Sequence, residues 1–198
     1  MSTNWKRFAR WAVSSLALVA SMQASTVLTL TPSSTLSGAG GTTVGWGFTL
    51  FNNTNFLVVN AAAFCVNPVS PPACTTPGAA IGTFTDFISA FNFFVVGPSP
   101  ESTSVSQSFN SALHTGIGSF AIAPGAGLGP INGQIVLDYS LFSVSPNDPN
   151  FDPNLDLVVA DAFVTASTTV NIVATPEPAS MGLCALGLAL TALAVRRR

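Results

Sequence analysis

The acidic segment near residue 150 is the part of this sequence whose residue types and spacing best suggest chemistry. Oxygen-bearing side chains occupy every second position, namely Asp148, Asn150, Asp152, Asn154 and Asp156. Calcium takes about six to eight oxygen ligands, and loops often supply them from Asp and Asn. The segment is not an EF-hand loop, because its sixth residue is Pro153 rather than Gly and its twelfth is Val159 rather than Glu. Asp-Pro-Asn is also a common turn former, so the pattern permits either a calcium site or a solvated turn.

The other residues that could act in catalysis are few. His114 is the only histidine, and no Gly-x-Ser-x-Gly motif accompanies it, so we expect a histidine in a surface loop. Asp138 and Asp161 could act as the acid and base of a glycoside hydrolase, in which two carboxyl groups flank the bond that is cut. Any two carboxylates of the central region fit that role equally well. The sequence therefore predicts that the protein is not an enzyme.

The distribution of charge excludes one class of partner. All six basic residues lie at the two ends of the chain, and none occurs between Trp11 and Val195. The central region, residues 25–174, contains seven acidic residues: Asp86, Glu101, Asp138, Asp148, Asp152, Asp156 and Asp161. A nucleic-acid partner is excluded, because nothing there would neutralise phosphate. Without Lys or Arg, each of these carboxylates must be solvated, hydrogen-bonded or bound to a metal.

Two cysteines bracket a proline-rich segment. Cys65 and Cys74 are separated by Val-Asn-Pro-Val-Ser-Pro-Pro-Ala, which cannot continue a strand or a helix. The two ends of the chain, described below, predict export to an oxidising compartment, so we expect a disulfide that closes this loop. A metal site is the weaker interpretation, since no other cysteine is nearby. Cys184 lies in the C-terminal tail and has no expected role in the folded domain.

Short runs rich in Thr, Val and Phe, separated by Gly, Pro and Asn, predict an all-β fold. Strands are expected at 26–31, 42–51, 56–65, 91–96, 102–109, 115–122, 133–144 and 157–173, and 81–90 is ambiguous between a short strand and a turn. Loops are expected at 32–41, 123–133 and 147–156. About seven to nine short strands with little helical periodicity favour a β-sandwich.

The segment Thr42–Phe51 shows the clearest alternation. Val44, Trp46, Phe48 and Leu50 would share one face of a strand, with Gly45 and Gly47 on the other, where another part of the chain could approach closely. A tryptophan at such a position is more often a core residue than a platform for a sugar ring.

Both ends of the chain carry targeting features. Lys6, Arg7 and Arg10 precede the apolar stretch 11–20, and small residues follow at 21–25. This arrangement is typical of a secretory signal peptide, expected at residues 1–24. At the other end, the uncharged apolar run 181–195 is followed by Arg196, Arg197 and Arg198. It is short for a membrane-spanning helix, but the arginines form a cytoplasmic stop. An ectodomain is thus expected at residues 25–174.

The C-terminal 24 residues resemble a known sorting signal. Pro176, Glu177 and Pro178, followed by the apolar run and the terminal arginines, are similar to a PEP-CTERM signal. The resemblance implies a transient membrane anchor at residues 175–198 that exosortase recognises and cleaves near the Pro-Glu-Pro motif. The central stretch also resembles small PEP-CTERM ectodomains, which implies no biochemistry. We therefore expect an exported surface or matrix protein with a structural or adhesive role in the extracellular polysaccharide layer. A calcium-dependent carbohydrate-binding module is the alternative, and a secreted hydrolase ranks third.

Overall fold

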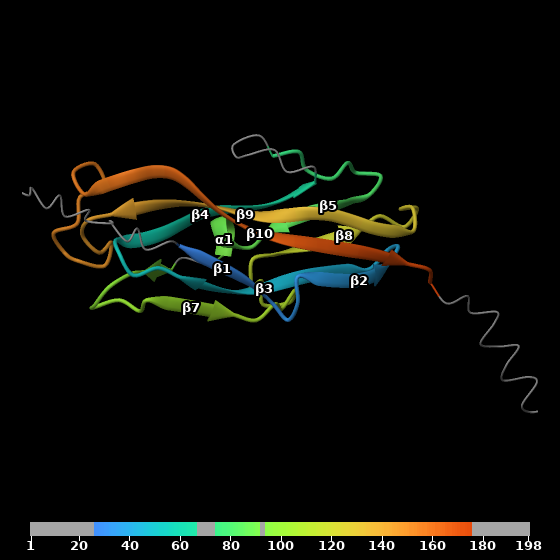
Figure 1. Cartoon of the computed structure of the whole chain (residues 1–198), viewed down its shortest axis with the longest axis horizontal. Helices are drawn as coiled ribbons and strands as arrows, with labels where there is room; N and C mark the ends of the chain where they lie inside the picture. Colours follow the sequence, from blue (N-terminus) through green and yellow to red (C-terminus); the bar gives the residue numbers. More distant parts are fainter. Residues whose placement is uncertain (1–25, 67–73, 92–93, 176–198) are drawn as a thin grey trace, which may run out of the picture.

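A computed structural model describes residues 26–66, 74–91 and 94–175. The expected signal peptide and nearly all of the expected sorting tail lie outside these residues. The described chain forms two five-stranded sheets that pack face to face, so the predicted all-β sandwich is confirmed (Figure 1). The number of strands was underestimated, since the described residues form ten strands rather than seven to nine.

The first sheet is antiparallel and follows the order β1-β3-β8-β5. Its strands are β1 (Val27–Thr31), β3 (Thr43–Phe51), β5 (Gly82–Asp86), β7 (Ser104–Gln107) and β8 (Gly118–Ile122). One edge of β3 pairs with β1. Its other edge pairs with β8 over residues 43–46 and with β7 over residues 48–51.

The second sheet follows the order β2-β10-β9-β4-β6. Its strands are β2 (Thr35–Ala39), β4 (Phe56–Val66), β6 (Val95–Val96), β9 (Gly129–Phe142) and β10 (Leu157–Val173). β2 is parallel to β10, and the other pairs are antiparallel. A single helical turn, α1 (Ile88–Phe91), follows β5, so the ambiguous stretch 81–90 contains both a strand and a turn.

The loop predicted over residues 32–41 is wrong, because it contains β2. The chain changes sheets after Thr31, and β2 then pairs with the end of β10 from Thr35↔Thr169 to Ala39↔Val173. The glycine that made this stretch look like a loop is needed for packing. A Cβ added to Gly38 would lie 2.8 Å from Cδ1 of Ile122 and 2.9 Å from Cγ1 of Val44. A small residue therefore lets β2 lie close against the first sheet.

The core lies between the two sheets and confirms the face predicted for 42–51. Trp46, Phe48 and Leu50 are fully buried. The Trp46 indole packs on Phe64 of β4 with ring centroids 5.4 Å apart. Trp46 is therefore a core residue rather than a platform for sugar. The expected close approach at Gly45 is also confirmed, because a Cβ there would overlap the Phe109 ring.

The predicted disulfide is present. Cys65, near the end of β4, is bonded to Cys74, and their Cα atoms are 5.2 Å apart. One residue further along each segment, the backbone N–H of Val66 donates a hydrogen bond to the carbonyl of Thr75 at 2.8 Å. The disulfide therefore joins the end of a central strand to the segment that leads into β5.

Candidate functional site

The β9–β10 hairpin places the acidic segment at one end of the sandwich. The register runs from Ile172↔Gly129 to Leu157↔Phe142, so residues 143–156 connect the ends of the two strands that lie farthest from Val173. In Figure 1 this loop forms the orange tip on the left. The rings of Phe142 and Phe151 meet edge to face at 5.1 Å and fix the loop against β9.

The carboxylates of this loop accept hydrogen bonds from the loop itself. Oδ1 of Asp148 accepts from the backbone N–H of Asn150 at 2.8 Å and from its side-chain amide at 3.1 Å. Oδ1 of Asp152 accepts from the N–H of Asn154 at 2.8 Å. Oδ2 of Asp156 accepts from the N–H of Asp152 at 2.8 Å. These are the side-chain-to-backbone bonds by which Asp forms turns.

The five predicted calcium ligands thus lie in one loop, as a succession of turns. Among residues 26–66, 74–91 and 94–175, no three His, Cys, Asp or Glu side chains are grouped as a metal-binding set. Each of these turns engages one oxygen of its carboxylate. The calcium site remains a prediction, and the observed hydrogen bonds are those of the competing interpretation, a turn.

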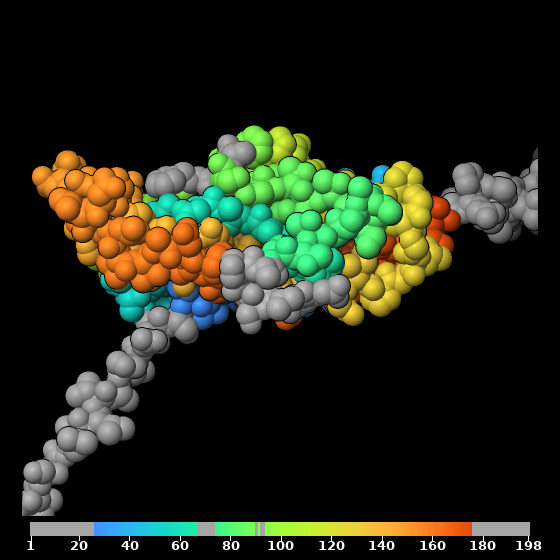
Figure 2. Space-filling view, turned by 90° about the horizontal axis from the view of Figure 1, so that it is seen from above, coloured from blue at the N-terminus to red at the C-terminus, as the bar shows by residue number. Residues whose placement is uncertain are grey.

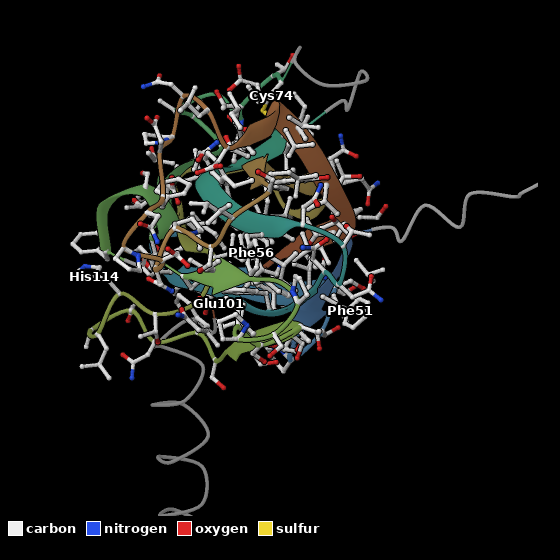
Figure 3. The ribbon with its side chains drawn as sticks, turned by 90° about the vertical axis from the view of Figure 1, so that its left-hand side faces the viewer. Phe51, Phe56, Cys74, Glu101 and His114 are labelled. Carbon is white, nitrogen blue, oxygen red and sulfur yellow. A yellow bond between two sulfur atoms is a disulfide. The ribbon has the colours of Figure 1, made fainter. Side chains whose placement is uncertain are left out.

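A groove that the sequence did not indicate lies at this loop and includes Glu101 in its lining. It has a volume of about 460 Å³ and is lined by Phe56, Pro100, Glu101, Ser143, Val144, Ser145, Asn147, Asp148 and Pro149. Figure 3 views this end of the molecule, with Glu101 just below Phe56. The groove combines an aromatic ring with carboxylate, hydroxyl and amide groups.

Hydrogen bonds fix the Glu101 side chain in this groove. Its Oε1 accepts from Oγ of Ser145 at 2.6 Å and from Nδ2 of Asn147 at 2.9 Å. These two bonds, that from Ser145 first, lower the pKa of Glu101, because they stabilise its charged form. The partners are far away along the chain and nothing in the residues around Glu101 signals them, so sequence reasoning missed the residue.

The structure places Asp138 near Asp161, as the hydrolase interpretation would require. Asp138 lies on β9 between Ala61 of β4 and Phe163 of β10. Burial raises the pKa of Asp138, and the negative charge of Asp161 raises it further, while a hydrogen bond from Asn60 opposes both effects. Within the described structure, Oδ1 of Asp138 is buried without a hydrogen-bond partner. The two carboxylates thus repel each other on the second sheet.

His114 belongs to an aromatic cluster. Its ring stacks on Phe91 with centroids 4.3 Å apart and meets Phe87 edge to face at 5.0 Å. The backbone has a positive φ of 51° at this residue. Figure 3 shows His114 at the periphery of the molecule. It is half-buried against other rings, so it is less exposed than the surface histidine that we expected.

The C-terminal features leave the sandwich at the end opposite the acidic loop. β10 ends at Val173, and Ala174 and Thr175 are exposed. The sorting-motif residues Pro176, Glu177 and Pro178 and the terminal Arg196–Arg198 lie outside the described residues. In the part of the chain that the structure describes, no helix is long and apolar enough to cross a bilayer.

Comparison with known proteins identifies the C-terminus. Residues 174–198 match the family model described as the PEP-CTERM protein-sorting motif. The motif indicates an exported protein that exosortase processes, as the sequence predicted. No curated protein matches the chain. Among solved structures, the ASH / PapD-like domain of human CEP192 (PapD-like domain 7) is similar at 11% identity, covering 85% of this chain and 100% of that domain, with a TM-score of 0.39.

Proposed function

We propose that this chain, an exosortase substrate by its PEP-CTERM motif, is a non-enzymatic surface or matrix protein with a structural or adhesive role in the extracellular polysaccharide layer. The observation that carries the proposal is the junction between domain and motif. The motif begins at residue 174, directly after the last residue of β10. The folded sandwich is therefore the cargo that sorting delivers, with no further domain between them.

The surface of the second sheet supports a polysaccharide partner. Thr165, Ser167 and Thr169 occur at alternate positions of β10, so they share one face of the strand, and they are exposed or half-exposed. Oγ1 of Thr169 donates to Oδ1 of Asn132 on β9. Hydroxyl and amide groups on a flat face suit hydrogen bonding to the hydroxyls of a neutral glycan. An anionic glycan would be repelled by the seven carboxylates of the domain.

The experiment for sorting compares wild type with a strain that lacks exosortase. In wild type, intact-mass analysis of the mature extracellular protein should find neither residues 1–24 nor the peptide 181–198. In the exosortase mutant the C-terminal tail should remain attached, and the protein should stay in the membrane fraction. Recovery of the tail on the mature extracellular form would rule out cleavage.

The adhesive role is tested by binding of the exported protein to exopolysaccharide purified from the same host. We expect sedimentation with the polysaccharide that chelator does not change. The alternative, a calcium-dependent carbohydrate-binding module, predicts binding that chelator abolishes. The groove that includes Glu101 would suit the ligand of such a module. Its calcium ion, however, would have to compete for the Asp oxygens that form the turns of the acidic loop. The two outcomes separate the two roles.

A further inference from the structure

At one end of the sandwich, several loops surround the C-terminal end of β10, where the chain leaves the fold. We call this region the exit end and define it as residues 39–42, 75–81, 123–129 and 173–175. Strand pairing brings these residues together: Ala39 pairs with Val173, Gly129 with Ile172, and Gly82 with Ile122. The N–H of Gly41 donates to Ile122 O, and the N–H of Ala123 donates to Ile81 O. Figure 1 shows this end on the right, where β10 turns red.

The exit end contains no charged residue. Along the two long strands, the first carboxylates are Asp138 on β9 and Asp161 on β10. At ~3.3 Å per residue these lie about 30 and 40 Å from the end of β10. The acidic loop lies farther still, at the opposite end of the hairpin. On the shorter strand β5, Asp86 lies four residues beyond Gly82, about 13 Å along the strand. Most carboxylates of the domain, including those of the acidic loop, lie farther from the exit end.

Two apolar side chains are exposed at this uncharged end. Leu128 is 69% exposed and Val173 is 40% exposed. Leu128 follows Gly125, Ala126 and Gly127, and a Cβ added to either glycine would meet nothing within 4 Å. This loop therefore exposes both glycines and Leu128 to solvent, while Ala126 between the glycines packs against the core. In the space-filling view it forms the yellow projection beside the red end of β10 (Figure 2).

The length of chain beyond the strand limits how far this end can stand from a membrane. The apolar run begins at Met181, so seven residues separate it from Val173. Even fully extended, that segment spans no more than about 30 Å. The interfacial layer of a bilayer accounts for roughly 5–8 Å of this on each side of the hydrocarbon. While the tail is inserted, Val173 therefore stays within about 30 Å of the start of the apolar run.

We propose that, before the tail is cleaved, the exit end rests on the lipid surface with Leu128 in the interface, and the acidic loop points away from the membrane. This inference rests on the proposed function, because it requires the tail to anchor. Leu128 and Val173 lose contact with water on binding, which is favourable. No charge must be desolvated at this end. In a membrane with anionic headgroups, repulsion of the acidic end adds to this preference, but the zwitterionic vesicles of the test below examine the apolar contact alone.

The test uses the full chain, expressed in a host that exports it, extracted from membranes and reconstituted into phosphatidylcholine vesicles without any sorting enzyme. Leu128→Trp and Leu155→Trp form a matched pair, since Leu155 is 83% exposed on the acidic loop. Part of the lipid carries brominated acyl chains, which quench tryptophan at the interface. The emission of the parent chain, including the buried Trp46, is subtracted. We expect about a twofold loss of emission for Leu128→Trp and no loss for Leu155→Trp.

Flotation of the same vesicles separates the two ways in which the proposal can fail. If the chain does not float with the vesicles, the tail does not anchor it, and both the proposed function and this inference are wrong. If the chain floats and neither tryptophan is quenched, or both are quenched equally, sorting stands and the orientation is wrong. A third outcome is that Leu128→Trp loses contact with water in native membranes that contain exosortase but not in the vesicles. That result would assign the contact to a protein and would also overturn the lipid proposal.

Discussion

The indole nitrogen of Trp46 on β3 donates a hydrogen bond to Oγ1 of Thr168 on β10, and the two atoms are 2.9 Å apart. The hydroxyl of Thr168 in turn donates to the carbonyl of Ser34 at 2.6 Å. One buried hydroxyl therefore links the two sheets to the segment where the chain crosses between them. The Ser34 carbonyl also accepts from the N–H of Thr169 at 2.9 Å, so loss of the Thr168 hydroxyl would leave the buried indole N–H of Trp46 without its partner.

Replacing Thr168 by valine should lower the free energy of unfolding by about 1–3 kcal/mol, since the buried indole N–H of Trp46 loses its partner while the volume is kept. Thr169→Val is the matched control, because its hydroxyl bonds to Asn132 in an exposed position and its loss should cost less than about 0.5 kcal/mol. Urea unfolding of both variants measures the difference. Equal stabilities would show that the buried bond contributes nothing.

Reduction of the disulfide should destabilise the domain by roughly 2–3 kcal/mol, because opening the loop between Cys65 and Cys74 restores conformational freedom to the unfolded chain. Cys65→Ser and Cys74→Ser should each show the same loss without reductant. Thermal melts with and without reductant provide the measurement. Labelling of free thiols at both positions in exported protein, without reductant, would contradict the bond itself.

Calcium should leave the melting temperature of the domain unchanged, because Asp148, Asp152 and Asp156 already accept hydrogen bonds within their turns. An ion that bound only the folded state at a hundredfold excess over its Kd would add roughly 2.7 kcal/mol, which is several degrees for a domain of this size. Melts in millimolar calcium and in chelator decide the question. A rise with calcium that Asp152→Ala abolishes would restore the predicted metal site.

The turn at Asp152 should depend on its acceptor oxygen rather than on its charge. Asp152→Asn keeps an oxygen that can accept from the N–H of Asn154, whereas Asp152→Ala removes it. We expect Asp152→Ala to cost about 0.5–1 kcal/mol and Asp152→Asn to be close to neutral. Urea unfolding in chelator measures both. Equal losses for the two variants would assign the role to the negative charge.

The raised pKa of Asp138 predicts that Asp138→Asn stabilises the protein at neutral pH. A carboxyl group whose pKa is higher in the folded than in the unfolded state opposes folding when it is ionised in both. The gain from asparagine should therefore be present at pH 7 and should vanish as the pH falls below the ordinary value of 3.8, where the group is protonated in both states. Urea unfolding at pH 7 and near pH 3 tests this.

Glu101→Gln should behave in the opposite way and serves as the comparison for Asp138→Asn. The pKa of Glu101 is lowered by its bonds from Ser145 and Asn147, so its ionised form stabilises the folded state. That contribution is fully present above the ordinary pKa of 4.5 and is lost as the pH falls through the lowered folded-state value. The glutamine variant should be less stable than wild type at pH 7 and equal to it in acid. The same sign for both variants would contradict the assigned electrostatics.

How far the sequence predicted this structure depends on which residues set each element. β3 and β4 lie within about one residue of their predicted bounds, because Val44 to Leu50 alternate strictly and Phe56 begins an uninterrupted β-rich run. β2 was missed because Gly38 reads as a turn residue, although packing over Ile122 requires it. Such a requirement comes from a strand far away in sequence and has no local signal.

The candidate sites divide in the same way. The disulfide could be predicted because its two cysteines are close in sequence and the loop between them contains three prolines. Glu101 could not, because Ser145 and Asn147 reach it only after the chain has passed through β7, β8 and β9. The spacing of Asp148 to Asp156 was recognised, but equal spacing fits both a metal loop and consecutive turns. The hydrogen bonds of the loop are those of turns, and the metal site stays a prediction.

The position of β10 has a mechanical consequence. It is the strand to which the C-terminal tail is attached, and its last five residues are held by β2 on one side while residues 168–172 are held by β9 on the other. Tension transmitted through Thr175 pulls β10 along its own axis, so the hydrogen bonds of both ladders bear the load together in shear rather than opening one after another. A shear-loaded strand resists force far better than one peeled from its end. We therefore expect the sandwich to stay folded when force is applied along β10 through its C-terminal tail.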